Sequence, residues 1–163
     1  MKILGIDPGT ATIGWAVIEA DGPKVSAVGY GHISTSKDDL PETRLQEIRD
    51  DLVAILKRYH PEEGAVEELF FFNNQKTAIA VSQARGVILL TLKDFGLRLS
   101  GYTPLEVKQA LTNYGRAEKK QVQIMVKTIL KLKEIPTPDD TADALAIAMC
   151  HASHQKFQKM TQV

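Results

Sequence analysis

The fold is decided by the stretch KILGIDPGT, residues 2–10. Its residues 3–6 are apolar without a break, which is typical of a strand buried on both faces at the centre of a sheet. Asp7 ends this run, and Pro8 and Gly9 then turn the chain sharply. A carboxylate therefore stands at the end of a central strand, where it serves either as a ligand or as the residue that forms the turn.

The segments that follow predict an α/β fold around this strand. Alternating and β-branched residues predict further strands at residues 14–19 and 24–35, which gives three antiparallel strands. Helical spacing and short apolar runs then alternate. We expect helices at 41–59, 73–95, 104–111, 118–132 and 138–157, with strands at 65–69 and 98–103. This order predicts a mixed five-stranded β-sheet, three antiparallel strands then two parallel, flanked by about five α-helices.

Length and composition predict one soluble domain. The 163 residues, 44% of them hydrophobic and 25% charged, suit a single core, so we expect one domain over residues 1–163. No apolar run approaches the roughly 20 residues that span a bilayer, and the start lacks the pattern of a secretion signal. We therefore expect a cytoplasmic location and no membrane partner. The single cysteine, Cys150, lies in an apolar stretch and is expected to be a buried, reduced thiol.

Charge is distributed unevenly along the chain, although the formal net charge is zero. Residues 37–68 hold five Lys or Arg against ten Asp or Glu, whereas residues 101–134 hold seven against three. A neutral chain argues weakly against nucleic acid, because phosphate binders usually carry a basic excess. The net charge of zero is therefore the sum of an acidic segment and a basic segment.

Two adjacent acids interrupt the fourth expected strand. Glu67 and Glu68 lie inside the apolar run 65–70, and strand alternation sends them to opposite faces. One of them must point where its neighbours are buried. The spacing leaves open which one it is, and a solvated edge position remains an alternative for either.

A third group of acids stands at the expected start of the last helix. Thr137 as N-cap and Pro138 at the first helical position would begin this helix. Asp139 and Asp140 would then stabilise the positive end of the helix dipole, without any chemistry. Asp143 is harder to explain, because unpaired charge among alanine and leucine neighbours is costly. It shares a helical face with either Asp139 or Asp140.

If the sheet brings these acids together, they form an all-oxygen metal site. Two carboxylates on one face repel each other unless a cation lies between them, and oxygen ligands suit Mg²⁺, with Mn²⁺ as a substitute. The chemistry of such a site is phosphodiester hydrolysis, in which two metal ions activate a water and stabilise the leaving 3′ oxygen. The histidines lack the spacing of a zinc site, and we expect His151 and His154 on the helix surface.

Six motifs follow one another along the chain. They are GIDPG at 5–9, AVEE at 65–68 with Phe70, QARG at 83–86, VKQ at 107–109, AEK at 117–119 and DTADALA at 140–146. Each motif alone is weak, because DPGT also resembles the phosphate loop of actin-like ATPases. Together, in this order, they resemble the RuvC family of Holliday junction resolvases, in the ribonuclease H-like superfamily, and the likeness runs from Lys2 to about Phe157.

The resemblance implies a ribonuclease H-like fold and a homodimeric, Mg²⁺-dependent endonuclease that acts on four-way DNA junctions. Such an enzyme nicks two opposed strands symmetrically and leaves 5′-phosphate and 3′-hydroxyl ends. A branch-migration motor complex is a further implied partner, and the small residues between Ala80 and Thr91 are compatible with a dimer contact. The catalytic and metal-binding roles fall on Asp7, Glu67, Asp140 and Asp143. Glu68 and Asp139 then become neighbours of the site.

The resemblance also implies DNA contacts. Lys108 and Lys119 match family lysines near the scissile phosphate, and Lys120 and Arg116 lie in the same basic segment. Phe70 matches an aromatic residue that stacks on bases unpaired at the crossover. As patterns alone, basic residues opposite an apolar face are more typical of a solvated surface, and core packing is the alternative for Phe70.

Three other functions compete on the sequence. An actin-like phosphotransferase would need a second domain to close over the nucleotide, which 163 residues do not supply. A module that binds junctions without cutting them would not need four intact acids. A metal nuclease for another branched or hybrid substrate remains open on the sequence alone.

Overall fold

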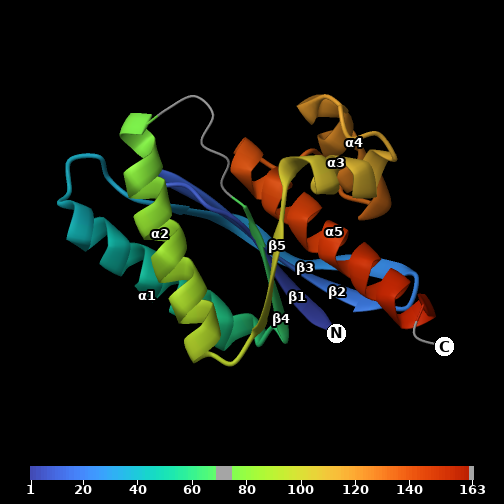
Figure 1. The fold of residues 1–163 in the computed structure, drawn as a ribbon, viewed down its shortest axis with the longest axis horizontal. Helices are drawn as coiled ribbons and strands as arrows, with labels where there is room; N and C mark the ends of the chain where they lie inside the picture. Colours follow the sequence, from blue (N-terminus) through green and yellow to red (C-terminus); the bar gives the residue numbers. More distant parts are fainter. Residues whose placement is uncertain (69–74, 162–163) are drawn as a thin grey trace.

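The computed structural model describes residues 1–68 and 75–161, and of residues 75, 76 and 157–161 it describes the backbone alone. Its centre is a five-stranded sheet in the order β3-β2-β1-β4-β5, with helices on both faces (Figure 1). The strands are β1 (Lys2–Asp7), β2 (Thr12–Asp21), β3 (Lys24–Ser34), β4 (Glu63–Glu67) and β5 (Arg98–Tyr102). The helices are α1 (Pro41–Tyr59), α2 (Gln75–Asp94), α3 (Pro104–Thr112), α4 (Lys119–Ile129) and α5 (Asp139–Thr161).

The strand pairing confirms the mixed sheet expected from the sequence. β2 pairs antiparallel with both β1 and β3, whereas β4 pairs parallel with both β1 and β5. β1 is therefore the central strand, and its residues 3–6 are buried. This position explains the unbroken apolar run, because neither face of the strand meets solvent.

Two apolar clusters fill the space on either side of the sheet. α1 and α2 pack on one face, where Leu4 and Ile6 belong to the same cluster as both helices. α5 crosses the other face with α3 and α4 beside it (Figure 1), and Ile3 belongs to this second cluster. Side chains alternate along a strand, so Gly5 and Asp7 also point toward α5. This side of the sheet is called the α5 face below.

Two glycines let α5 lie directly on the sheet. A Cβ atom at Gly5 would stand 2.2 Å from the backbone oxygen of Ala144, and one at Gly14 would stand 1.8 Å from that of Asp140. Real Cβ atoms do not approach backbone oxygens so closely, so only glycine permits this packing. The first turn of α5 thereby rests on Gly14, which pairs with Asp7 at the end of β1.

Local hydrogen bonds set the starts of α3 and α4. Thr103 caps α3, because its side chain accepts from the backbone N–H of Glu106 while the Glu106 carboxylate accepts from the backbone N–H of Thr103. At the start of α4, the backbone N–H of Glu118 donates to the side chain of Gln121 at 2.9 Å. The bond from Glu118 therefore marks the start of α4, whose first residue is Lys119.

The ends of several elements differ from the sequence expectation, and three of them bear on the site. α5 begins at Asp139, one residue after the expected Pro138, and the peptide bond before Pro138 is cis. α4 ends at Ile129 and not at residue 132, because Lys131 adopts a φ of 54° that no right-handed helix contains. β4 begins earlier than expected, at Glu63. The expected end of this strand at residue 69 and the expected start of the next helix at residue 73 lie outside the described residues.

A buried polar network ties β4 and β5 to α5, and it shows that the expected surface position of His151 is wrong. His151 is 1% exposed, and its Nε2 atom lies 2.5 Å from a carboxylate oxygen of Glu63, which is also 1% exposed. Its Nδ1 atom lies 2.8 Å from the hydroxyl oxygen of Tyr102. Arg98 forms an ion pair with Glu63, and the half-buried His154 stacks on the Tyr102 ring. Pairing keeps the buried carboxylate from being costly.

The small-residue face of α2 packs against its own sheet. Ala84 and Ile88 are fully buried, and Thr91 is 3% exposed. These buried residues are therefore not available for the dimer contact with which the sequence pattern is compatible. The large apolar residues that α2 exposes are Ile79 and Leu90.

Two further expectations concern burial and membranes. Cys150 is fully buried, as expected, and burial raises the pKa of its thiol to about 12. The thiol therefore stays protonated at neutral pH. Across residues 1–68 and 75–161, no helix is both long and apolar enough to cross a membrane.

Replacing Tyr102 by Phe should destabilise the fold, because the Nδ1 atom of buried His151 loses its partner. A buried polar atom left unsatisfied typically costs about 1–3 kcal/mol, and we expect the free energy of unfolding in urea to fall by about that amount. Tyr30→Phe removes a hydroxyl from an exposed strand residue and should leave stability unchanged. Equal stability of the two variants would mean that the Tyr102 hydroxyl contributes nothing to the network.

Candidate active site

Asp7 and Glu67 end neighbouring strands on the same face of the sheet. β1 and β4 run parallel in a register that makes these two residues neighbours, so both point to the α5 face. Gly14 stands beside Asp7 on β2, and Tyr102 stands beside Glu67 on β5. The two carboxylates therefore lie in one row across the sheet.

The first turns of α5 bring two more acids to this row. The backbone oxygen of Asp140 rests against Gly14, one strand away from Asp7. Asp143, one helical turn further on, is close enough for its charge to act on both Asp7 and Glu67. Three elements, β1, β4 and α5, thus bring together the four acids singled out in the sequence.

The neighbouring acids Glu68 and Asp139 are placed differently. Glu68 is exposed beyond the end of β4, and its side chain covers Gly101 of β5. Asp139 is exposed and accepts a hydrogen bond of 3.0 Å from the side chain of Gln123 on α4. Its charge still acts on Asp143, whereas Glu67, Asp140 and Asp143 are the acids whose charges raise the pKa of Asp7.

Burial and mutual repulsion make these carboxyl groups hard to ionise together. Burial, followed by the charges of Glu67, Asp143 and Asp140, raises the pKa of Asp7 from 3.8 to about 8. Burial also raises the pKa of Glu67 and that of Asp143. A hydrogen bond from Asp7 to Glu67 holds a proton between the two carboxyl groups. The cluster thus retains a proton near neutral pH when no metal cation is bound.

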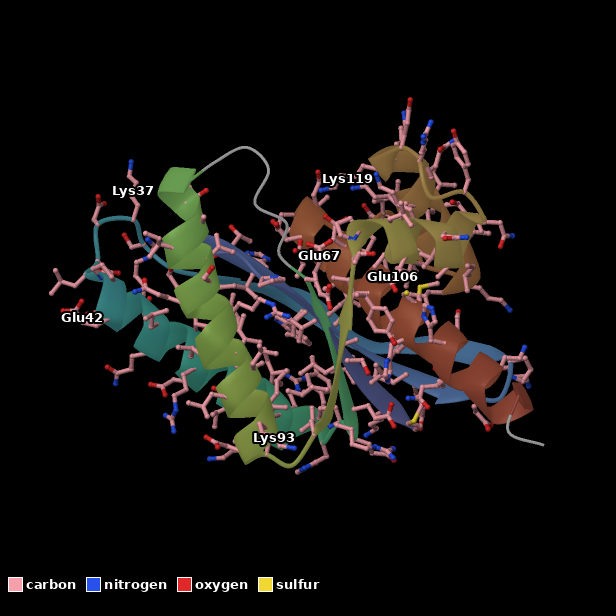
Figure 2. The ribbon with its side chains drawn as sticks, in the orientation of Figure 1. Lys37, Glu42, Glu67, Lys93, Glu106 and Lys119 are labelled. Atoms are coloured by element: carbon pink, nitrogen blue, oxygen red, sulfur yellow. The ribbon has the colours of Figure 1, made fainter. Side chains whose placement is uncertain are left out.

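Lys119 brings positive charge to the cluster from the start of α4. Its Nζ atom lies 2.8 Å from an oxygen of Asp143 and 3.4 Å from one of Asp139. Burial lowers the pKa of Lys119, but its hydrogen bond to Asp143 and the charges of both acids outweigh this effect and raise the pKa overall. Figure 2 shows Lys119 and Glu67 near the same end of the sheet, whereas Lys93 lies at the far end of α2.

A cleft of about 190 Å³ opens beside the acids. Two of the acids, Glu67 and Asp143, line it together with Lys108 and Lys119. Both lysines that the resemblance places near the scissile phosphate therefore border the same space as two of the carboxylates. The rest of the lining is apolar and consists of Pro104, Val107, Val122, Ala146 and Ile147.

The other residues expected to contact DNA are not part of this cleft. Lys120 and Arg116 are exposed at and just before the start of α4, outside the lining. Phe70 lies outside the described residues, so its stacking role stays a prediction. The structure accordingly groups Lys108 and Lys119 with the acids and leaves the remaining basic residues on the surface nearby.

The acids suit a hard divalent cation, although they are not preformed around one. Every donor is a carboxylate oxygen, the ligand type that Mg²⁺ and Mn²⁺ prefer. Within the part of the chain that the structure describes, no three Asp, Glu, His or Cys side chains are arranged to hold a metal ion as they stand. The charges of the acids disfavour ionisation of Asp7, and Asp143 pairs with Lys119. Metal binding would have to displace the lysine and the retained proton.

Two arginines on the other side of the sheet donate to backbone oxygens at or just beyond the ends of β1 and β4 and were not singled out in the sequence. Arg44 of α1 donates to the backbone oxygen of Thr10, in the loop after Asp7. Arg85 of α2 donates to the backbone oxygen of Glu67. In the sequence, only the QARG motif draws attention to Arg85, and no motif draws attention to Arg44.

Comparison with known proteins identifies the family. The family described as crossover junction endodeoxyribonuclease RuvC matches residues 3–151. The RuvC endodeoxyribonuclease of Fusobacterium nucleatum subsp. nucleatum is 54% identical over 151 residues, which cover 93% of this chain and 80% of the relative. That of Finegoldia magna is 48% identical and covers 100% of this chain and 99% of the relative.

A solved structure agrees with these relatives. Thermus thermophilus RuvC in complex with a Holliday junction substrate superposes with a TM-score of 0.88 at 35% identity, and the match covers 96% of each chain. The mixed five-stranded sheet expected from the resemblance is thereby confirmed. With its acid cluster at the end of the central strand, the chain belongs to the RuvC family of crossover junction endodeoxyribonucleases and has the ribonuclease H-like fold.

Proposed function

We propose that this chain resolves four-way DNA junctions by paired, symmetric, metal-dependent hydrolysis of phosphodiester bonds. The observation that carries the proposal is the group of four carboxylates from β1, β4 and α5, in which the pKa of Asp7 rises to about 8. So much negative charge in a partly buried site is costly unless cations neutralise it. Membership of the RuvC family and the junction complex of the T. thermophilus relative support this choice of substrate.

The proposed metal ligands and catalytic residues are the four acids of the cluster. We propose Mg²⁺ with two ions per site, and Mn²⁺ as a substitute, because hard cations bind several carboxylate oxygens. Bound metal ions would supply the activation of water and the stabilisation of the leaving 3′ oxygen, which gives 5′-phosphate and 3′-hydroxyl ends. The carboxylates would hold and orient the metal ions without reacting themselves. They are Asp7, Glu67, Asp140 and Asp143.

Lys119 and Lys108 are proposed to bind the DNA backbone next to the acids. Lys119 forms an ion pair with Asp143, with its Nζ atom 2.8 Å from a carboxylate oxygen. Released from Asp143, its ammonium group would reach into the cleft that Lys108 also lines. Two ammonium groups at this place would offset the repulsion between the carboxylates and an incoming phosphate.

Further DNA contacts are proposed around the same end of the fold. Lys120 and Arg116, both exposed, would contact phosphates further along the DNA and position it without reading its sequence. Phe70 would stack on a base that is unpaired at the crossover. By family resemblance alone, we also propose a branch-migration motor complex as a partner and the cytoplasm as the location.

We propose a homodimer, because two opposed strands are cut symmetrically when two copies present identical sites. The proposed contact is the exposed side of α2, where Ile79 and Leu90 are 70% and 64% exposed. Gly86 lies between them on the same side, and a Cβ atom there would meet nothing within 4 Å. Large apolar side chains exposed along one side of a helix are typical of an interface.

The function is tested by incubating the protein with a labelled four-way junction, a linear duplex and an RNA–DNA hybrid, each in Mg²⁺ or in EDTA. We expect paired, symmetric, ligatable cuts that are confined to the junction and absent in EDTA. Equal cutting of the duplex or the hybrid would contradict the proposal and favour a metal nuclease for another substrate. Binding of the junction without any cut would favour a module that does not cleave.

Removing a proposed metal ligand should abolish cleavage and preserve junction binding. We expect Asp7→Asn and Glu67→Gln each to slow cleavage by more than the roughly 10–100-fold typical of losing a group that only supports a metal ligand. The affinity for the junction in EDTA should equal or slightly exceed that of the wild type, because each change removes negative charge that faces phosphate. Glu68→Gln, at the next residue, is the matched control and should cleave like the wild type. Affinity lost in parallel with cleavage would argue against the assignment.

Without metal, the acid cluster should make the fold less stable as the pH rises. A carboxyl group whose folded pKa exceeds its unfolded value binds protons preferentially in the native state. The stability that proton binding to Asp7 adds to the fold is therefore fully present below its unfolded pKa of 3.8, and it is lost as the pH rises through about 8. In EDTA, we expect Tm to fall from about pH 5 to about pH 8 more steeply in the wild type than in Asp7→Asn. Equal slopes in the two proteins would contradict this account.

Replacing Leu90 by Glu should convert the dimer into a monomer, because the interface would have to bury an unpaired charge. Light scattering after size-exclusion chromatography measures the mass in solution. Leu105→Glu changes an apolar residue of α3 that is 56% exposed, and this control should remain dimeric. A Leu90→Glu variant that stays dimeric at the same concentration would place the contact elsewhere.

A further inference from the structure

We propose that Arg44 and Arg85 are positioning residues for the acid cluster. From the face of the sheet opposite to α5, they hold the two strand ends that carry Asp7 and Glu67. Each arginine acts through a backbone oxygen and not through a carboxylate. The inference rests on the proposed metal-dependent function, because it concerns the same site.

Arg85 fixes the end of β4. Its Nε atom donates a hydrogen bond of 3.1 Å to the backbone oxygen of Glu67, the last residue of the strand. On the other side, the backbone N–H of Glu68 donates to the backbone oxygen of Tyr102 at 2.8 Å. The peptide group between Glu67 and Glu68 is therefore held at its oxygen by α2 and at its nitrogen by β5. Its orientation sets where the Glu67 side chain leaves the backbone.

Arg44 fixes the loop that follows Asp7. Its Nη2 atom donates at 2.7 Å to the backbone oxygen of Thr10, and its Nε atom donates at 2.9 Å to the side-chain oxygen of Thr35. The Thr35 hydroxyl donates in turn to the same backbone oxygen at 2.6 Å. These three residues form a closed ring that joins α1, the loop after β1 and the end of β3. A planar guanidinium suits this ring, because its N–H donors are fixed relative to one another.

The strand ends need this support because direct pairing between β1 and β4 stops just before the acids. The last paired residues of the two strands are Ile6 and Val66. Asp7 and Glu67 follow them, and burial beside other carboxylates makes it costly for both groups to be ionised at this point. The separation of the two acids therefore depends on what holds each strand end from outside. The two arginines and the outer strands β2 and β5 are those supports.

The first test measures Mn²⁺ binding by electron paramagnetic resonance in Arg44→Met and Arg85→Met. Methionine keeps an unbranched apolar side chain and removes the donors. We expect each variant to bind Mn²⁺ about tenfold more weakly or worse, the loss typical of removing a group that orients a metal ligand. Arg49→Met is the matched control, because Arg49 also lies on α1 but is exposed and pairs only with its neighbour Asp50 among the described ion pairs.

A second test uses amide hydrogen exchange in the metal-free protein. The N–H of Thr35 bonds to the backbone oxygen of Ala11 at 3.1 Å, next to the Arg44 ring. The N–H of Glu68 belongs to the peptide group that Arg85 holds. We expect the Thr35 amide to exchange faster only in Arg44→Met, and the Glu68 amide only in Arg85→Met.

Wild-type Mn²⁺ affinity in both variants, or unchanged exchange at both amides, would overturn the inference. Faster exchange throughout the sheet would overturn it as well, because the arginines would then stabilise the fold in general. Loss of junction affinity in EDTA would make them DNA contacts instead of positioning residues. If the wild type itself bound no Mn²⁺, the proposed function would fail, and the exchange pattern would still decide whether the arginines hold the strand ends.

Discussion

Repulsion among partly buried carboxylates is the constraint on which the rest of this structure depends. Asp7 ends the central strand with three other acids around it, and burial together with their charges raises its pKa to about 8. Buried charge of this kind is costly unless opposite charge is near. Lys119 brings positive charge to within 2.8 Å of Asp143. In the proposed enzyme, divalent cations would replace the retained proton and balance the remaining charge.

The two faces of the sheet contribute differently to this site. On the α5 face, two glycines admit the helix backbone so closely that α5 delivers Asp140 and Asp143 to the strand ends. On the opposite face, α1 and α2 fill the core and, in our proposal, hold the same strand ends through their arginines. The network of Glu63, His151 and Tyr102 ties β4 and β5 to α5 further from the acids. The site therefore depends on how helices pack on both sides.

One expectation from the sequence was wrong, and one compatible pattern has another role, for a related reason. His151 was expected on the helix surface, and the small residues between Ala80 and Thr91 were compatible with a contact to a second copy, yet the chain buries His151 and the inner side of α2 itself. A helix with apolar residues on several sides does not show which side faces the sheet. The burial of Glu63 was equally hidden, because its partners Arg98 and His151 come from other elements.

The sequence by itself determined the order of the elements, the central place of β1 and the acidic character of the site. These properties follow from local patterns: an unbroken apolar run, turn residues and acids placed where apolar neighbours are buried. The order of the motifs also pointed to the family. Spacing left open whether Glu67 or Glu68, and Asp139 or Asp140, belongs to the cluster. Strand register directs Glu67 to the α5 face, and helix packing places Asp140 against Gly14, the neighbour of Asp7. Only the tertiary structure decided how the acids meet a lysine from α4 and two arginines from behind the sheet. These contacts join residues far apart in the chain, and their distances depend on packing that no local pattern encodes.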